Sequence, residues 1–281
     1  MIDLSYIRES PLDNELKPSP YFRWKRVVDF VLAAILLVPG IPIIGLLVIL
    51  VRLTSPGPGI FRQLRVGKDG KTFRMYKIRT MTRDAEDRTG VVWAQVNDSR
   101  VTWIGRVLRK LHLDEFPQLF NVLNGEMSLI GPRPERPEFV HVLAKEIPGY
   151  LDRLAVLPGI TGLAQINLEP DTDLDSVRCK LVLDLDYIRN AGLLLDARMF
   201  VCTFIRLLGF SGDCAMRIMR LHREVPDNGS PEAADGSSVQ LPHTTATPVS
   251  IANRADQVHG GQECLARSRA NLDTPAQTKP R

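Results

Sequence analysis

The feature that most constrains this chain is one apolar stretch long enough to cross a lipid bilayer. From Phe30 to Val51 every residue is apolar, glycine or proline, and about 20 such residues suffice for a membrane helix. The segment Tyr21–Arg26 just before it mixes aromatic and basic side chains, as at a membrane interface. The apolar run is too long for a cleaved signal peptide. The sequence therefore predicts a membrane-embedded helix near the N-terminus.

Two details favour a helix that enters the membrane, bends and returns. Pro39 and Pro42 flank Gly40 and Ile41 in the middle of the run, where they remove backbone donors and favour a bend. Basic residues stand on both sides of the run, whereas a spanning helix usually has them mainly on one side. We therefore expect a re-entrant membrane helix-hairpin over residues 23–55. A single kinked spanning helix is the alternative, because prolines are tolerated in membrane helices.

Length and composition set the domain organisation. With 281 residues and 44% hydrophobic content the chain can form one substantial core. We predict a flexible arm at 1–22, a catalytic domain at 56–224 and a disordered tail at 225–281 that has no aromatic residue. The net charge of +4 indicates no nucleic-acid partner, and four widely spaced cysteines fit reduced thiols. The expected class is α+β: a compact, mostly helical cytosolic domain with a β-hairpin and interfacial amphipathic helices.

A β-hairpin is expected directly after the membrane segment. Residues 60–66 and 72–81 flank a turn that contains Asp69-Gly70, a strong hairpin signal. On a strand, Lys77 and Arg79 would share one face. Such cations suit a diphosphate or anionic lipid headgroups, and a solvated strand face is equally compatible with the pattern.

Residues 113–134 carry the strongest chemical signal. Asp114 and Glu115 stand before a helical pattern of apolar residues that Gly125 ends, and Arg133 lies between two prolines. A pair of acids beside a cation on a restricted backbone suits phosphate chemistry. The alternative is a core helix with acids in its first turn.

Other segments frame this region. Asp98-Ser99 is a potential cap for a helix that ends with Arg109 and Lys110, so a basic wall beside the acids is expected. Residues 82–97 form a polar loop of the kind that can close over a substrate. Residues 193–210 predict an interfacial helix, or else a core helix, followed by a basic cluster at 217–223.

Several ordered motifs together resemble the bacterial sugar transferase family, the monotopic phosphoglycosyl transferases. The resemblance covers about residues 23–222. The motifs are Lys25-Arg26-Val27-Val28-Asp29, Ser55-Pro56-Gly57-Pro58, Phe61-Arg62-Gln63, Val66-Gly67-Lys68-Asp69-Gly70, Tyr76-Lys77-Ile78-Arg79-Thr80-Met81, Leu113-Asp114-Glu115-Phe116-Pro117-Gln118-Leu119, Gly131-Pro132-Arg133-Pro134 and Pro158-Gly159-Ile160-Thr161-Gly162.

The resemblance implies an enzyme that transfers a sugar 1-phosphate from a nucleoside diphosphate sugar, usually a UDP-sugar, to undecaprenyl phosphate. It implies that Asp114 is the nucleophile and a ligand of Mg²⁺, and that Glu115 is its partner in the catalytic pair. Phosphate contacts are expected from Arg109, Arg133, Lys77 and Arg79. The expected location is the cytosolic face of the bacterial inner membrane, with membrane lipids and downstream glycosyltransferases as further partners. The glycan could be exopolysaccharide, capsule, O-antigen or a glycoprotein glycan.

Some positions depart from the commoner family pattern. His112 stands where a small hydroxyl residue often precedes the acids, and Leu157 replaces a frequent basic residue. Residues 167–170 lack an arginine that many members carry. These differences concern contacts to the nucleotide and sugar. A membrane-anchored scaffold or lipid-binding protein of a polysaccharide assembly complex is the alternative function, although a scaffold has no need of both acids.

Overall fold

The structure is a computed structural model, and it describes residues 16–83, 85, 98–171, 173–207, 216, 219–221 and 223. Most of the predicted arm, nearly all of the predicted loop at 82–97 and the predicted tail from 225 onward lie outside these residues. The described part mixes helices and strands, as the sequence predicts. Its elements are α2 (Phe22–Thr54), β1 (Ile60–Val66), η1 (Lys68–Gly70), β2 (Thr72–Ile78), α3 (Trp103–Lys110), η2 (Leu113–Glu115), α4 (Gln118–Leu123), β3 (Ser128–Ile130), α5 (Pro137–Glu146), η3 (Tyr150–Ala155), β4 (Gly159–Thr161), α6 (Leu163–Asn167), α7 (Leu174–Asn190) and α8 (Leu193–Leu207).

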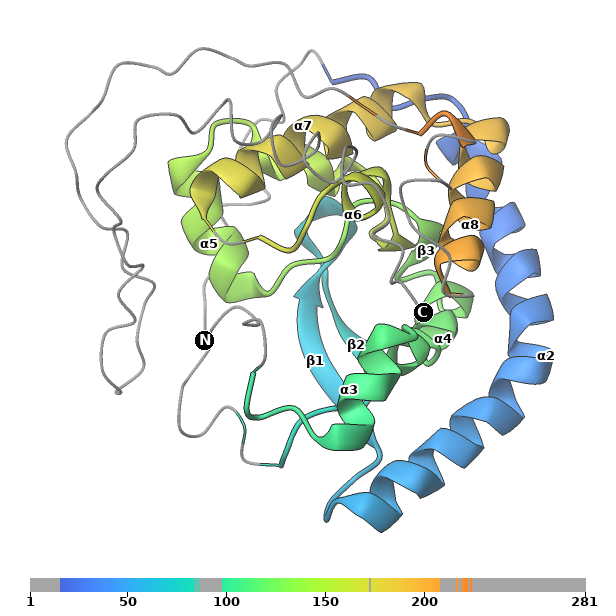
Figure 1. Cartoon of the computed structure of the whole chain (residues 1–281). Coiled ribbons are helices and arrows are strands. Elements are labelled where there is room, and N and C mark those ends of the chain that lie inside the picture. Colours follow the sequence, from blue (N-terminus) through green and yellow to red (C-terminus); the bar gives the residue numbers. More distant parts are fainter. Residues whose placement is uncertain are drawn as a thin grey trace, which may run out of the picture.

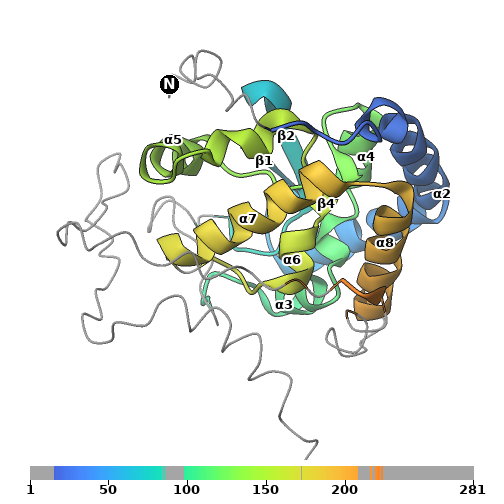
Figure 2. The same cartoon turned by 90° about the horizontal axis from the view of Figure 1, so that it is seen from above.

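Two small sheets lie among these helices. Strands β1 and β2 pair antiparallel, and β3 pairs parallel with β4. Figure 1 shows the hairpin in the middle of the molecule, with α2 along the right-hand side of the view and α7 across the top. Seen from above, α2 again forms one edge, next to α4 and α8 (Figure 2). One hydrophobic core joins α2 to the hairpin, α4 and α8, and a second lies beneath α5 and α7.

The predicted hairpin is confirmed, although its second strand is shorter than expected. Ile60 pairs with Ile78 and Val66 with Thr72, which closes the hairpin around the turn η1. Strand β2 ends at Ile78 rather than at Met81, and Met81 instead forms an isolated bridge with Val101. The face assignment made from strand alternation therefore does not extend to residue 79.

Helix α2 is one continuous 33-residue helix that contains Pro39 and Pro42. Figure 1 shows that it changes direction along its length. It is long and apolar enough to cross a membrane. The chain does not separate here into two helices, so a re-entrant path with both ends on one side stays a prediction. One stripe at helical spacing is buried against the rest of the protein: Lys25, Asp29, Ala33, Leu37, Gly40, Ile44, Leu47 and Val51.

The other faces of α2 are apolar and exposed. Among its large side chains, Val38 is 75% exposed and Leu53 is 80% exposed. In water such a surface is unfavourable, because burying apolar area is the main source of stability. The exposed surface of α2 therefore fits contact with lipid, as the apolar run predicts.

Buried ion pairs and a hydrogen bond attach the N-terminal end of α2 to α8 and β3. The Lys25 ammonium bonds the carboxylates of Asp29 and Asp196, and Ser128 donates its hydroxyl to Asp29 Oδ2 at 2.7 Å. Asp29 is thus paired with Lys25, one turn earlier in the helix. Because breaking a buried ion pair leaves an uncompensated charge, these contacts tie α2 firmly to β3 and α8.

Two local predictions need correction. The cap of α3 is Thr102, whose hydroxyl accepts the backbone N–H of Gly105, and Asp98 instead pairs with Arg100. Helix α4 begins only at Gln118, so Asp114 and Glu115 lie in the separate 3-10 turn η2. The buried side of α4 carries Gln118, Leu119, Asn121 and Val122, whereas Phe120 is 40% exposed.

Helix α8 combines the two alternatives considered from the sequence. Met199 and Cys202 are fully buried, whereas Leu194 is 64% and Phe204 55% exposed. One side is therefore a core helix. The other side is apolar surface of the kind that an interfacial helix presents.

Candidate active site

Three segments that are distant in the sequence meet at the side chain of Glu115. Its Oε1 atom lies 2.8 Å from Lys77 Nζ on β2 and 2.9 Å from Arg133 Nη2 in the loop after β3. Glu115 itself lies in η2 and is buried. One buried carboxylate thus binds two cations, and we call these three residues the Glu115 clamp.

The electrostatics of the clamp keep Glu115 ionised. Burial alone would raise the pKa of this carboxyl group, but the charges of Lys77 and Arg133 and their hydrogen bonds outweigh it and hold the pKa well below its ordinary value. The Glu115 charge in turn raises the pKa of Arg133. Burial lowers the pKa of Lys77, and the charge of Glu115 opposes that effect, so the clamp holds one carboxylate between two basic side chains.

Asp114 is adjacent in the chain but in a different electrostatic state. Its side chain is buried, and none of the residues that the structure describes makes a hydrogen bond or ion pair with it. Burial raises the pKa of Asp114, and the charges of Lys77 and Arg109 only partly oppose that effect. The pair therefore contains one acid that is neutralised by partners and one that is available to bind or attack.

The turn that presents both acids begins with a strained residue. His112 has φ 51°, in the left-handed region that non-glycine residues rarely adopt, and its carbonyl accepts the Glu115 N–H at 3.3 Å. Such backbone conformations cluster at functional sites because the surrounding structure holds them there. This residue is one of the departures noted in the sequence, and its backbone conformation sets the direction of the turn.

Arg109 lies on the same side as the acids. It is in the last turn of α3, and its Nε donates to Thr80 Oγ1 at 2.9 Å. Asp114 is among the charges that act on its guanidinium. Thr80 was not singled out in the sequence, although it lies in the motif Tyr76–Met81. The structure brings Arg109, Arg133 and Lys77 together around the acids, as predicted.

Arg79 does not join this group. Its Nη1 donates to the Pro56 carbonyl at 2.8 Å, and its Nη2 donates to the Ser55 carbonyl at 2.6 Å. It therefore closes the turn after α2 and does not face the acids with Lys77. Of the two cations predicted on this strand, Lys77 reaches Glu115, whereas the guanidinium of Arg79 is held by the carbonyl groups that follow α2.

The start of the loop that carries Arg133 packs closely on strand β4 and on Gly162, the residue after it. A Cβ added to Gly159 would lie 2.1 Å from the backbone nitrogen of Gly131, and one added to Gly162 would lie 2.3 Å from the Gly131 carbonyl oxygen. The backbones of these two segments therefore approach each other closely. Only glycine leaves room for this contact.

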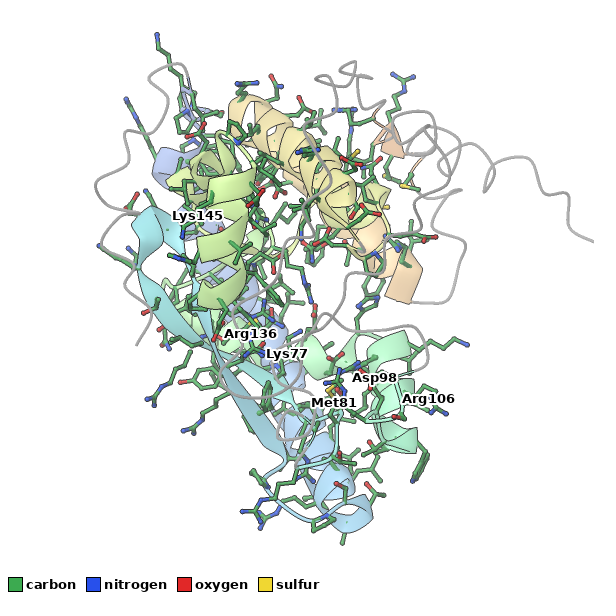
Figure 3. The ribbon with its side chains drawn as sticks, turned by 90° about the vertical axis from the view of Figure 1, so that its left-hand side faces the viewer. Lys77, Met81, Asp98, Arg106, Arg136 and Lys145 are labelled. Carbon is green, nitrogen blue, oxygen red and sulfur yellow. The ribbon has the colours of Figure 1, made fainter. Side chains whose placement is uncertain are left out.

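A view from the side places the site among its neighbours. Figure 3 shows Lys77 in the middle of the molecule, with Met81 and Asp98 beside α3, whereas Arg106 of α3 points outward. The basic residues of α3 thus divide between two directions. Arg106 is exposed, and Arg109 turns toward Thr80 and the acids.

The site offers few ligands for a metal ion. Within the described part of the chain there is no group of three or more histidine, cysteine, aspartate or glutamate side chains that would hold one. Glu115 is already occupied by two cations, so Asp114 is the acid available here. Mg²⁺ fits such a site, because it often binds through one or two carboxylates and completes its shell with water and substrate phosphates.

The comparison with protein families agrees with this arrangement. Residues 20–209 match the model for the bacterial sugar transferase family. This match covers more than half of the chain, including α2, the Glu115 clamp and Asp114. The protein belongs to the bacterial sugar transferase family.

Relatives with assigned names act on polyprenyl phosphate. A UDP-N-acetylgalactosamine-undecaprenyl-phosphate N-acetylgalactosaminephosphotransferase of Aeromonas hydrophila is 43% identical over 209 residues, which is 74% of this chain and 49% of that protein. A UDP-glucose:undecaprenyl-phosphate glucose-1-phosphate transferase of Caulobacter vibrioides is 42% identical over 66% of this chain and 69% of the relative. The chain thus spans about half the length of the Aeromonas protein, and the two relatives are named for different sugars.

The two acids should respond oppositely to neutralisation. Glu115→Gln removes the counter-charge of Lys77 and Arg133, so we expect the free energy of unfolding to fall by about 3 kcal/mol. Asp114→Asn removes a buried charge without partners, so stability at pH 7 should be unchanged or higher. Thermal unfolding of the detergent-purified proteins, followed by circular dichroism, measures both.

The pH dependence provides the control. An acid with a raised pKa in the folded state destabilises that state at pH values above its ordinary pKa. The stability advantage of Asp114→Asn should therefore shrink as the pH falls through the raised pKa of folded Asp114, and it should vanish below the ordinary value of 3.8, where wild-type Asp114 is protonated in both states. Equal destabilisation by the two substitutions at pH 7 would contradict the assignment of different charge states.

Proposed function

We propose that this protein transfers a sugar 1-phosphate from a UDP-sugar to undecaprenyl phosphate, as the first membrane step in the synthesis of a bacterial glycan. The observation that carries the proposal is a buried Asp114 with no hydrogen-bond or ion-pair partner among the described residues, next to a Glu115 that pairs with Lys77 and Arg133. Membership of the sugar transferase family supports it. A scaffold gains nothing from an uncompensated buried carboxylate, which costs stability.

The reaction proceeds by two displacements at one phosphorus atom. A carboxylate oxygen of Asp114 attacks the phosphorus that carries the sugar, and the bond from that phosphorus to the nucleoside monophosphate breaks. The leaving group takes the electron pair, and the enzyme holds an aspartyl phosphosugar. An oxygen of undecaprenyl phosphate then attacks the same phosphorus and releases Asp114. A covalent intermediate lets the water-soluble donor and the lipid acceptor bind in turn.

The surroundings of Asp114 suit this role. A buried carboxylate has few water molecules to lose before it attacks, and Lys77, Arg109 and Arg133 oppose its repulsion by the donor's phosphates. Arg133 presents the best geometry for a phosphate oxygen, because prolines on both sides restrict its backbone. Glu115 orients Lys77 and Arg133 through its two ion pairs. Arg79 has no part in this set.

Mg²⁺ is the cofactor that fits. Asp114 would hold it together with the diphosphate of the donor, where the ion neutralises phosphate charge. Glu115 Oε1 is held by Lys77 and Arg133, so Asp114 would be the main acidic ligand. The side chains of the protein would thus position the diphosphate of the donor, and the ion would add positive charge beside it.

The attachment of α2 supports a re-entrant path. The helix is about 50 Å long at roughly 1.5 Å per residue, against a hydrocarbon core of about 30 Å. Lys25 near one end and Val51 near the other are both buried against the same globular part. A straight crossing would draw that part into the bilayer. We therefore place both ends of α2 and the catalytic domain on the cytosolic face of the inner membrane, with the bend near Pro39 and Pro42.

The membrane and the later enzymes of the pathway complete the set of partners. The exposed apolar surface of α2 contacts acyl chains, and basic residues on both sides of it face anionic headgroups. The lipid-linked product is then extended by downstream glycosyltransferases. Relatives named for glucose and for N-acetylgalactosamine leave the sugar open between at least these two.

Removal of the nucleophile tests the proposed reaction. Asp114→Asn should lower release of uridine monophosphate from a UDP-sugar at least about 1,000-fold, in the presence of undecaprenyl phosphate and Mg²⁺, because the first displacement is lost. The assay measures nucleotide release and transfer of radiolabelled sugar to lipid. Asp175→Asn, on the exposed surface of α7, is the matched control. Full activity of Asp114→Asn would exclude the nucleophile assignment.

Cysteine labelling tests the path of α2. In a background whose four native cysteines are replaced by alanine, Pro20→Cys and Ser55→Cys should both be shielded from a membrane-impermeant maleimide in intact spheroplasts. Both should react in inverted membrane vesicles, because a re-entrant helix keeps its two ends in the cytosol. Reaction of one position in spheroplasts and the other in inverted vesicles would establish a spanning helix instead.

A further inference from the structure

The loop around Arg133 is held through its carbonyl oxygen atoms. Four consecutive carbonyl groups each accept a hydrogen bond, and the four donors come from three separate parts of the chain. The donors are Gly159 N to Pro132 at 2.8 Å, Arg153 Nη2 to Arg133 at 3.0 Å, Arg65 Nη1 to Pro134 at 2.9 Å and Val66 N to Glu135 at 2.9 Å. Two of these donors are backbone groups of strands or their neighbours, and two are arginine side chains.

The arginine donors matter because the segment Pro132–Pro134 lacks two of the backbone N–H groups that would fix its own conformation. Pro132 and Pro134 have no N–H group, so neither can donate a backbone hydrogen bond that would fix a turn. The carbonyl of Arg133 itself is bonded by Arg153. The direction in which the Arg133 side chain leaves the backbone therefore depends on that contact.

Arg153 is itself fixed by a buried ion pair. Its Nε and Nη2 lie 3.0 Å and 2.7 Å from Asp184 Oδ2, and its Nη1 donates to the Tyr150 hydroxyl at 2.9 Å. The side chains of Arg153 and Asp184 are only 3% and 2% exposed. A buried ion pair is a costly way to gain stability, since apolar residues often serve as well. The hydrogen bond from Arg153 to the Arg133 carbonyl indicates that the pair also fixes the backbone of the Arg133 loop.

Arg65 holds the next carbonyl group in a similar way. It lies on β1, where its Nε and Nη2 donate to Gln63, and its Nη1 lies 3.5 Å from Glu135 Oε2. Glu135 in turn bonds Lys180 at 2.6 Å. Burial opposes ionisation of Glu135, but Lys180 and the arginines outweigh it and lower its pKa to about 2. Arg65 thus keeps an ionised partner while it binds the loop.

We propose that Arg153, fixed by Asp184, is a positioning residue for phosphoryl transfer, and that Arg65 supports it. Arg153 acts on the backbone of Arg133 and thereby sets the distance from the Arg133 guanidinium to Glu115 and to the donor's phosphates. This inference rests on the proposed function. In catalysis a misplacement of about 1 Å can cost about 100-fold in rate, so loss of one such contact has a measurable effect.

A double-mutant cycle separates positioning from general stability. If Arg153 acts through Arg133, Arg153→Gln should lower kcat/KM for nucleotide release about 100-fold in the wild-type background, but less than about threefold when Arg133→Lys is already present. The affinity for UDP, measured by calorimetry without turnover, should show the same coupling. Arg178→Gln replaces an exposed arginine on α7 that pairs with Asp175, and it should leave both quantities unchanged.

Each outcome of the cycle supports or overturns the role of Arg153 as a positioning residue. Equal losses in the two backgrounds, or a folded Arg153→Gln protein with wild-type activity, would overturn the inference. If Arg153→Gln does not fold, the cycle is made with Arg65→Gln, whose side chain is more exposed, and the same coupling to Arg133→Lys is expected. If the wild-type protein releases no nucleotide from any UDP-sugar, the proposed function fails, and this inference fails with it.

Discussion

Glu115 binds Lys77 and Arg133 with one buried oxygen atom, and the arrangement of the site depends on that contact. The two cations come from a β-hairpin and from a proline-bounded loop, so the clamp joins segments that no local interaction would bring together. The two ion pairs of the clamp also neutralise the negative charge of Glu115. Asp114, the residue before it, is buried and has no hydrogen-bond or ion-pair partner among the described residues. Burial raises its pKa, and acids with perturbed pKa values cluster at functional sites.

The membrane helix α2 packs directly against the segments that form the site. Its stripe of buried residues runs from Lys25 to Val51, and Gly40, near the middle, faces Phe116 and Leu119 just after the acids. At the other end of the domain, Asp29 bonds Ser128 on β3, the strand that leads to Arg133. A site built directly against an apolar helix suits a reaction whose acceptor is held in the bilayer and whose donor is dissolved in water.

Much of this arrangement follows from the sequence. Alternation and Asp69-Gly70 predict the hairpin, and the apolar run predicts α2. The acids, Arg109, Arg133 and Lys77 meet as expected. The sequence fails where tertiary contacts override local pattern: β2 ends before Arg79, and Phe120 stays exposed although its spacing fits a buried face. Arg153 and Asp184 carry no local signal, because their role depends on a loop about 20 residues or more away.

The central claim is that Asp114, and not Glu115, takes the phosphosugar. The most direct measurement is mass spectrometry of the purified protein after incubation with a UDP-sugar and Mg²⁺ without lipid acceptor, followed by fragmentation of the peptide that holds both acids. The account predicts an added sugar phosphate on Asp114, which disappears when undecaprenyl phosphate is supplied. An adduct on Glu115, or turnover without any adduct, would contradict it.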